Sequence, residues 1–190
     1  KIQEKNEVLN FISESDALTG CMNRRGFIEK TLQMNRDHEG EELLILFADL
    51  DHLKEINDFF GHIEGDFSIR HCAEVLKKVV GADGIVGRIG GDEFCVVTLG
   101  NLKDGQQIIE RIREESDAFN CTSDKEYYVE LSAGCTSVIC RNGLVIADAL
   151  READRALFKL LMSYQTVCST ISRCTVWISV SHCYQCRLVF

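Results

Sequence analysis

The chain has 190 residues, of which 45% are hydrophobic and 27% charged, and its formal net charge is -9 at pH 7. These values describe one globular domain with some additional chain, and the charge argues against nucleic-acid binding through a broad basic surface. No stretch reaches the roughly 18 unbroken apolar residues of a membrane span, and no signal peptide is visible. We therefore expect a cytoplasmic fragment that contacts neither nucleic acid nor membrane, excised from a longer protein because it begins at Lys1.

The first part of the chain predicts two helices. Residues 1–15 carry a partial apolar stripe that includes Ile2 and Leu9, which is typical of a linker helix at the end of a coiled coil. A turn at Ser15-Asp16 then precedes a second helix, from about Arg24 to about Asp37.

A buried strand follows. Residues 43–51 form an apolar run that ends in Asp49 and Asp51, which is typical of a strand buried on both faces. Alternate side chains of a strand point to the same face, so the two carboxylates are expected on one side. A buried carboxylate is costly unless it is paired or bound to metal. The alternative is that Asp51 caps the helix that follows.

Residues 52–80 predict a short helix, a glycine turn and a long helix from about Asp66 to Val80. Four polar side chains distinguish this stretch: Lys54, Asn57, His62 and Asp66. Structural roles remain open for two of them, because Asn57 is a common turn residue and Asp66 a suitable helix cap.

A β-hairpin is predicted over residues 84–100, with Gly90, Gly91, Asp92 and Glu93 at its turn. The glycines permit a tight turn and the close approach of a ligand, and the two acids place carboxylates near the tip. Carboxylates held in this way suit a hard divalent cation such as Mg²⁺, which prefers oxygen ligands. The alternative is an ordinary turn with solvated acids.

Three further elements complete the body of the chain: a helix over 104–119, a strand over 127–138 and a helix over 146–162. The order of helices and strands indicates an α+β fold, an α/β sandwich in which helices cover one sheet.

The cysteines divide into two groups. Six of the ten are dispersed through the body, which favours reduced core cysteines: Cys21, Cys72, Cys95, Cys121, Cys135 and Cys140. The other four lie in residues 166–190, where Asp and Glu are absent. A zinc site there is poorly supported, because the segment has one Cys-x-x-Cys pair. We interpret 166–190 as an atypical Cys-rich tail of non-native or divergent origin.

The motifs together resemble the GGDEF domain, the diguanylate cyclase family, over about residues 13–162. Three blocks carry the resemblance: Asp16-Ala17-Leu18-Thr19-Gly20 with 23–25, the polar positions of 49–66, and Arg88-x-Gly90-Gly91-Asp92-Glu93-Phe94. Residues 131–134 and 153–158 match more weakly. The resemblance implies a central, mainly antiparallel sheet flanked by helices, related to nucleotidyl cyclases and polymerase palms. It divides the chain into a linker helix (1–15), a GGDEF domain (16–165) and the tail (166–190).

The resemblance also implies an activity, the condensation of two GTP molecules into cyclic di-GMP with release of two pyrophosphates. Two divalent ions, Mg²⁺ or Mn²⁺, would activate the 3′-hydroxyl and stabilise the leaving group. Because each domain would hold one GTP, catalysis is expected in a homodimer. An upstream sensor region would control it, with this domain as the output module of a bacterial signalling protein.

Site residues follow from the same resemblance. The implied metal ligands are Asp49, the main-chain carbonyl of Leu50, Asp92 and Glu93. Asp92 or Glu93 would accept the proton, and Lys54 would stabilise the phosphate charge. The substrate-binding residues would be Lys54, Asn57, His62 and Asp66. A carboxylate at position 66 can accept the N1–H and N2–H₂ donors of guanine, a pair that adenine lacks.

The sequence departs from the family pattern at one residue and in one short stretch. Leu161 stands where the family has a phosphate-contacting lysine, and residues 79–84 lack the arginine of an Arg-x-x-Asp product site. We therefore predict no product inhibition through that site. The change at Leu161 keeps an alternative open, a catalytically weak or inactive GGDEF domain that acts as a GTP-binding regulatory module.

Overall fold

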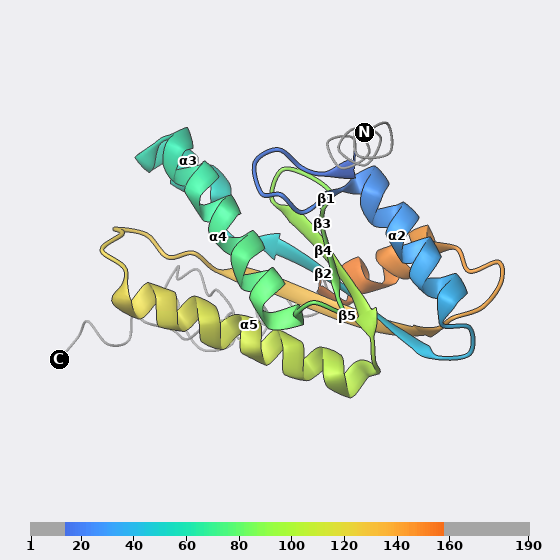
Figure 1. The fold of residues 1–190 in the computed structure, drawn as a ribbon. Coiled ribbons are helices and arrows are strands. Elements are labelled where there is room, and N and C mark those ends of the chain that lie inside the picture. The colour runs from blue at the N-terminus through green and yellow to red at the C-terminus, as the bar shows by residue number, and fades with distance from the viewer. Residues whose placement is uncertain (1–13, 158–190) are drawn as a thin grey trace.

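The structure is a computed structural model that describes residues 14–157 (Figure 1). The elements in chain order are β1 (Met22–Asn23), α2 (Arg24–Asp37), β2 (Glu42–Leu50), α3 (Leu53–Phe60), α4 (His62–Val80), β3 (Ile85–Arg88), β4 (Glu93–Leu99), α5 (Leu102–Thr122) and β5 (Leu131–Ile139). Residues 146–157 are also helical and are called the 146–157 helix below. Most of the expected linker helix, Leu161 and the tail lie outside the described residues.

The strands form one sheet in the order β1-β3-β4-β2-β5. Strand β2 pairs antiparallel with both β4 and β5, and β3 pairs antiparallel with β4. Strand β1 is parallel to β3. The mainly antiparallel α+β fold that the sequence and the resemblance predicted is therefore confirmed.

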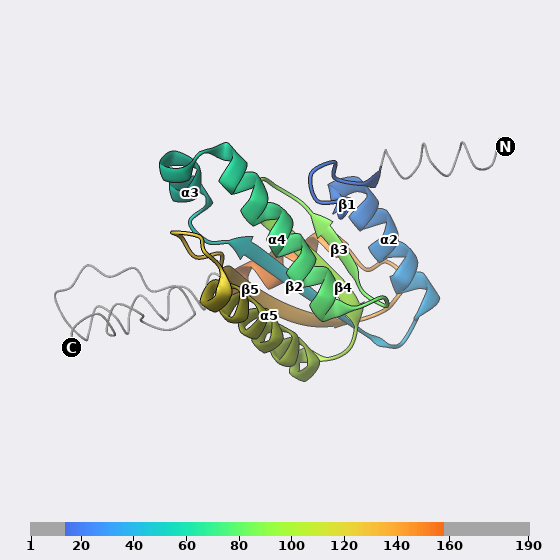
Figure 2. The same cartoon turned by 60° about the vertical axis from the view of Figure 1, so that its left-hand side comes forward.

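Strand β2 lies at the centre of two hydrophobic layers, because its side chains alternate between two covered faces. Leu44 and Leu46 pack with residues of α4 and α5 on one face, and Leu43 and Ile45 pack on the other with Phe27 of α2 and the 146–157 helix. Figures 1 and 2 show these helices on the two sides of the sheet. The prediction of a strand buried on both faces is confirmed.

The long helix α4 begins at His62, earlier than the sequence predicted, because Gly61 reverses the chain with φ 89°. Asp66 therefore lies inside the helix and not at its cap. Asn57 lies within α3 and not in a turn. The structural roles considered for these two side chains are both wrong.

Strand β5 begins at Leu131, later than predicted. The Asn120 side chain of α5 accepts from the N–H of Val129 (2.9 Å) and donates to its carbonyl (3.1 Å). The Asn120 amide thus occupies the N–H and the carbonyl of Val129, which a neighbouring strand would otherwise bind. Residues 123–130 therefore form a loop.

The six body cysteines are free, as predicted, and four of them are buried, the exceptions being Cys121 and Cys135. Within residues 14–157, no helix combines the length and the apolar character needed to cross a membrane.

Candidate active site

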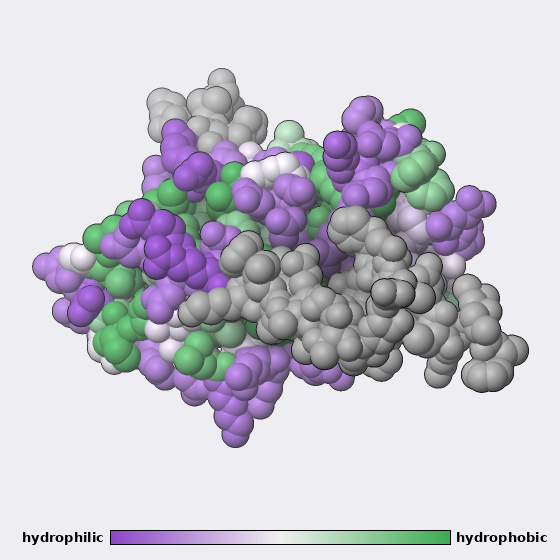
Figure 3. All heavy atoms as spheres, turned by 180° about the vertical axis from the view of Figure 1, so that it is seen from behind, coloured by the Kyte–Doolittle hydropathy of each residue, from purple (hydrophilic) through white to green (hydrophobic). Residues whose placement is uncertain are grey.

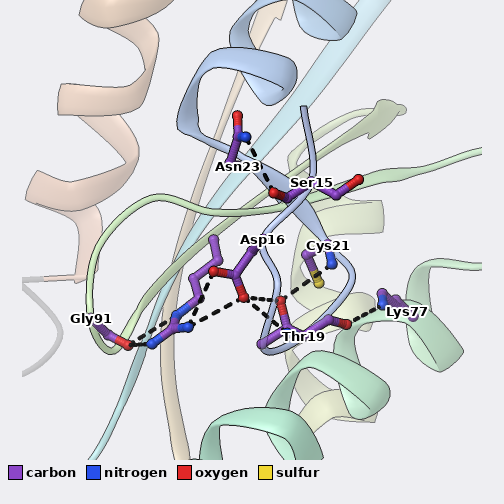
Figure 4. A network of polar contacts seen from close by, with 8 residues as sticks. Ser15, Asp16, Thr19, Cys21, Asn23, Lys77 and Gly91 are labelled. Carbon is purple, nitrogen blue, oxygen red and sulfur yellow. Dashed lines mark hydrogen bonds and ion pairs between the residues drawn. The ribbon is translucent and has the colours of Figure 1, made fainter. Parts of the chain in front are cut away.

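The turn between β3 and β4 is fixed by Arg88. Its guanidinium donates to the carbonyl of Gly91 (2.7 and 3.1 Å) and to both carboxylate oxygens of Asp16 (3.2 and 3.3 Å). Across the turn, the Ile89 N–H donates to the carbonyl of Glu93 at 2.8 Å. The hairpin predicted from the sequence is confirmed, and its tip is tied to the N-terminal segment of the domain (Figure 4).

Asp16 is itself held by Thr19, whose N–H and hydroxyl donate to it at 2.9 and 2.7 Å. Burial raises the pKa of Asp16, but the Thr19 hydrogen bonds and the Arg88 guanidinium outweigh it and bring that pKa below its ordinary value. The Lys77 ammonium donates to the Thr19 carbonyl at 2.8 Å (Figure 4). This network joins the first motif of the sequence to the glycine turn.

Three carboxylates gather where β2 ends and β4 begins. Asp49 is directly opposite Glu93 in the antiparallel register, and the Leu50 N–H donates to the main-chain carbonyl of Asp92 at 3.1 Å. Burial first, and then the charges of Asp92, Asp51, Glu93 and Asp154, raise the pKa of Asp49 to about 7. The site is therefore short of positive charge.

Asp92 and Glu93 line different cavities. An open pocket of about 240 Å³ is lined by Asp49, Leu50, Asp51, His52, Leu53, Lys54, Glu55, Asp92 and Ser132. Glu93 instead lines a pocket of about 530 Å³ between α2 and the 146–157 helix, together with Asp154. The structure thus brings Asp49, Leu50, Lys54 and Asp92 to one opening, while Glu93 lines the other pocket.

Asp51 lines the same opening, but it does not cap α3, whose N-cap is His52. The Ser132 hydroxyl of β5 lies 2.9 Å from each of its carboxylate oxygens. Burial raises the pKa of Asp51 to about 6, although the Ser132 hydrogen bond lowers it. Sequence reasoning missed the roles of Ser132 and Asp154, for which the weak family matches at 131–134 and 153–158 were the available signal.

The predicted base-binding residues lie at the α3–α4 corner. Asn57 Oδ1 is 3.1 Å from His62 Nδ1, and a Cβ on Gly65 would lie 2.1 Å from the same oxygen. Gly65 therefore leaves the space that the Asn57 amide fills. Asp66 follows His62 by four residues, so both share a face of α4.

Apolar surface adjoins these polar groups. Phe59 and Ile63 are 79% and 81% exposed, and the rear view shows hydrophobic residues at this corner (Figure 3). Hydrogen-bonding side chains beside apolar surface suit a planar, polar-edged ligand such as a nucleobase.

No group of three His, Cys, Asp or Glu side chains forms a ready metal cage among residues 14–157. Mg²⁺ does not require one, since it is usually held by one or two carboxylates with waters and substrate phosphates. The oxygen-rich, negatively charged opening at Asp49 and Asp92 fits that mode of binding.

The family whose model matches the chain is described as "Diguanylate cyclase, GGDEF domain", over residues 13–164. The chain therefore belongs to the GGDEF family of diguanylate cyclases, as its motifs indicated.

Two curated relatives are diguanylate cyclases named DgcP. The one from Escherichia coli is 37% identical over 164 residues, covering 84% of this chain and 48% of the relative. The one from Pseudomonas aeruginosa is 34% identical over 151 residues, covering 76% of this chain and 22% of the relative. The chain thus spans about half of one relative and about a fifth of the other.

Solved structures share the fold. The coiled coil and GGDEF domain of DgcB from Caulobacter crescentus, in complex with c-di-GMP, has a TM-score of 0.73 at 25% identity, covering 83% of this chain and 85% of that one. SiaD from Pseudomonas aeruginosa, in complex with its activator SiaC, has a TM-score of 0.73 at 28% identity, covering 85% and 63%.

Proposed function

We propose that this domain condenses two GTP molecules into cyclic di-GMP and releases two pyrophosphates. In each of two steps a ribose 3′-hydroxyl attacks the α-phosphorus of the other nucleotide. The new phosphorus–oxygen bond forms as the bond to pyrophosphate breaks, and the hydroxyl proton leaves. The observation that carries the proposal is the meeting of Asp49, Asp92 and Lys54 at one opening, with Glu93 opposite Asp49.

Asp49, Asp92, Glu93 and the Leu50 carbonyl would hold Mg²⁺ or Mn²⁺, two ions in each site. When bound, the ions make the 3′-hydroxyl more acidic and offset the charge of the departing pyrophosphate. Burial and, after it, the neighbouring carboxylates raise the pKa of Asp49 to about 7, which supports this assignment because a bound divalent cation would offset the negative charge at the site.

The chain's own side chains would then divide the remaining work. Asp92 or Glu93 would accept the hydroxyl proton, and Lys54, which lines the opening, would stabilise charge on the phosphates. Asn57, His62 and Asp66 would bind the guanine edge, and the Asn57–His62 contact supports a shared role for them.

The active species would be a homodimer in which each domain presents one GTP to the other. Control by an upstream region of a longer signalling protein is part of the proposal, and it is supported by the greater length of the two DgcP relatives.

Pyrophosphate release from GTP and Mg²⁺ tests the reaction. Asp92→Asn should abolish release, while the matched control Asp83→Asn, an exposed acid in the turn before β3, should leave it unchanged. The GTP-binding regulatory module would be supported instead if the wild-type chain bound GTP without releasing pyrophosphate. Equal release from wild type and Asp92→Asn would overturn the proposed role of Asp92.

A further inference from the structure

The loop that leads into β5 contacts the base-binding corner, and its last residue reaches the carboxylate site, where the Glu130 carbonyl accepts from the Asp51 N–H at 3.0 Å. Residues 123–130 connect α5 to β5, and Figures 1 and 2 both show this loop beside the α3–α4 corner. Glu64, in the first turn of α4, accepts two hydrogen bonds from it. One comes from the Lys125 ammonium at 2.7 Å and the other from the Tyr127 hydroxyl. We call Glu64, Lys125 and Tyr127 the Glu64 clamp.

Aromatic contacts extend the Glu64 clamp on both sides of the glycine turn. The Tyr127 ring lies 4.9 Å from the ring of Phe60, the last residue of α3. The Lys125 ammonium lies 4.5 Å from the centre of the Phe67 ring on α4. The loop therefore contacts the corner before, within and after the stretch that carries His62 and Asp66.

The Glu64 clamp holds the face of α4 that turns away from the base-binding residues. At 3.6 residues per turn, Glu64 is roughly 200° around the helix from His62. Its contacts therefore leave His62 and Asp66, both exposed, on the open face. Such an arrangement fixes the helix without occupying the space that a base needs.

The loop is itself anchored to the body of the domain. The Asn120 side chain of α5 pairs with both main-chain groups of Val129, a residue that is 1% exposed. The Lys125 N–H donates to the Ser123 hydroxyl at 3.2 Å. Hydrogen bonds from Lys125 and Tyr127 lower the pKa of Glu64, so its carboxylate is charged at neutral pH.

We infer that Glu64, Lys125 and Tyr127 are positioning residues that hold the α3–α4 corner in the geometry with which Asn57, His62 and Asp66 recognise guanine. The inference rests on the proposed function of these three residues. The Glu64 clamp sets the affinity and base selectivity of the site and leaves the reacting groups at Asp49 and Asp92 alone.

Binding of GDP and IDP tests this inference, because neither diphosphate can undergo the reaction and they differ in the guanine 2-amino group. Calorimetry with Mg²⁺ would compare wild type with Tyr127→Phe, which keeps the ring contact with Phe60, and with Glu64→Gln. Each variant should weaken GDP binding about 3- to 10-fold and IDP binding less, so that the preference for GDP falls. Glu114→Gln, an exposed acid on α5, is the matched control and should bind as wild type does.

The double variant should lose less GDP affinity than the sum of the two single losses, because both changes weaken the same hydrogen bond between Glu64 and Tyr127. Unchanged Kd values for GDP and IDP in both single variants would overturn the inference. The inference would also be overturned if a variant lost the same affinity for GDP and for IDP and had a lower Tm, because that result would indicate general destabilisation of the fold. If the wild-type chain bound neither GTP nor GDP, both the proposed function and this inference would fail. If the wild-type chain binds GDP, the variants test the positioning role separately from the proposed function.

Discussion

Asp49 of β2 and Glu93 of β4 are directly opposite each other in the central antiparallel pair of the sheet. Burial and the neighbouring acids raise the pKa of Asp49 from 3.8 to about 7. Because the folded-state pKa lies above the unfolded value, the folded protein binds the proton more tightly between these values. The free energy of unfolding therefore falls as pH rises from about 4 to about 7, and this part of the stability stays lost above that pH.

Removal of this charge should stabilise the protein while ending its activity. Asp49→Asn should raise Tm by several degrees at about pH 8 in the presence of a chelator, on the order of 1 to 2 kcal/mol after discounting for partial exposure. At about pH 4 most of the difference should disappear, because Asp49 is then protonated in the folded state and close to half protonated in the unfolded state. Thermal unfolding at the two pH values, with Asp83→Asn as control, checks this. A lower Tm for Asp49→Asn at the higher pH would contradict it.

Divalent cations should stabilise the wild-type chain more than this variant. A ligand that binds the folded state alone raises the free energy of unfolding by about 2.7 kcal/mol at a concentration of 100 times its Kd. A Mg²⁺ titration of Tm should therefore show a saturable rise in wild type and little or none in Asp49→Asn. Parallel rises in both proteins would place the bound cation elsewhere.

The Arg88–Asp16 pair should be a stability element of the hairpin. Arg88→Met leaves the Asp16 carboxylate and the Gly91 carbonyl without this donor, which should lower the free energy of unfolding by about 1 to 3 kcal/mol at neutral pH. The pKa of Asp16 is held below its ordinary 3.8, so the stability that it contributes is present above that pH and is lost on acidification. Urea unfolding should accordingly show a smaller wild-type advantage at about pH 3 than at about pH 7. A pH-independent difference would argue against this electrostatic origin.

Ser132 should stabilise the folded protein through its hydrogen bond to the Asp51 carboxylate. The Ser132 side chain is buried, and Ser132→Ala removes the hydroxyl that lies 2.9 Å from both carboxylate oxygens. We expect a loss of about 1 to 2 kcal/mol at about pH 8 and a smaller loss at about pH 5, where Asp51, with a pKa raised to about 6, is largely protonated. Chemical denaturation at both pH values measures this. Equal losses would show that the missing volume, and not the carboxylate, is responsible.

The position of the Asn57 side chain should depend on the absence of a side chain at Gly65. The added Cβ of Gly65→Ala would lie 2.1 Å from Asn57 Oδ1 and displace the amide from His62. We expect GDP affinity to fall about 10-fold, as for the loss of one well-placed polar contact. In an Asn57→Ala background the same glycine change should have little further effect. Additive losses in the double variant would mean that Gly65→Ala acts through the helix backbone instead.

The periodicity of the sequence was enough to predict β2, the β3–β4 hairpin and the long helices. Six of the nine residues of β2 are buried and only Glu42 is exposed, and such a run has few alternatives to a strand covered on both faces. The start of α4 was placed too late because it depends on the positive φ of Gly61, which the residue type permits but does not require. Strand β1 has two residues and depends on its pairing with β3, a tertiary contact that no local pattern encodes.

The identities of the candidate site residues came from the family resemblance, and their spatial relations came from the structure. Asp16 and Arg88 are 72 positions apart, and Asp51 and Ser132 are 81 apart, so spacing alone could not pair them. The hydrogen bonds between Glu64 and the 123–130 loop could likewise not be predicted, because nothing in the sequence indicates which residue a single surface Glu, Lys or Tyr contacts.

The most direct test of the central proposal is identification of the product formed from GTP and Mg²⁺ by chromatography with mass detection, over a series of protein concentrations. We predict cyclic di-GMP with two pyrophosphates for each product molecule, a rate per protein that rises with concentration as homodimers form, and no product from Asp49→Asn. Wild-type protein that binds GTP but yields no cyclic di-GMP at any concentration would contradict the account, as would product formation by Asp49→Asn at the wild-type rate.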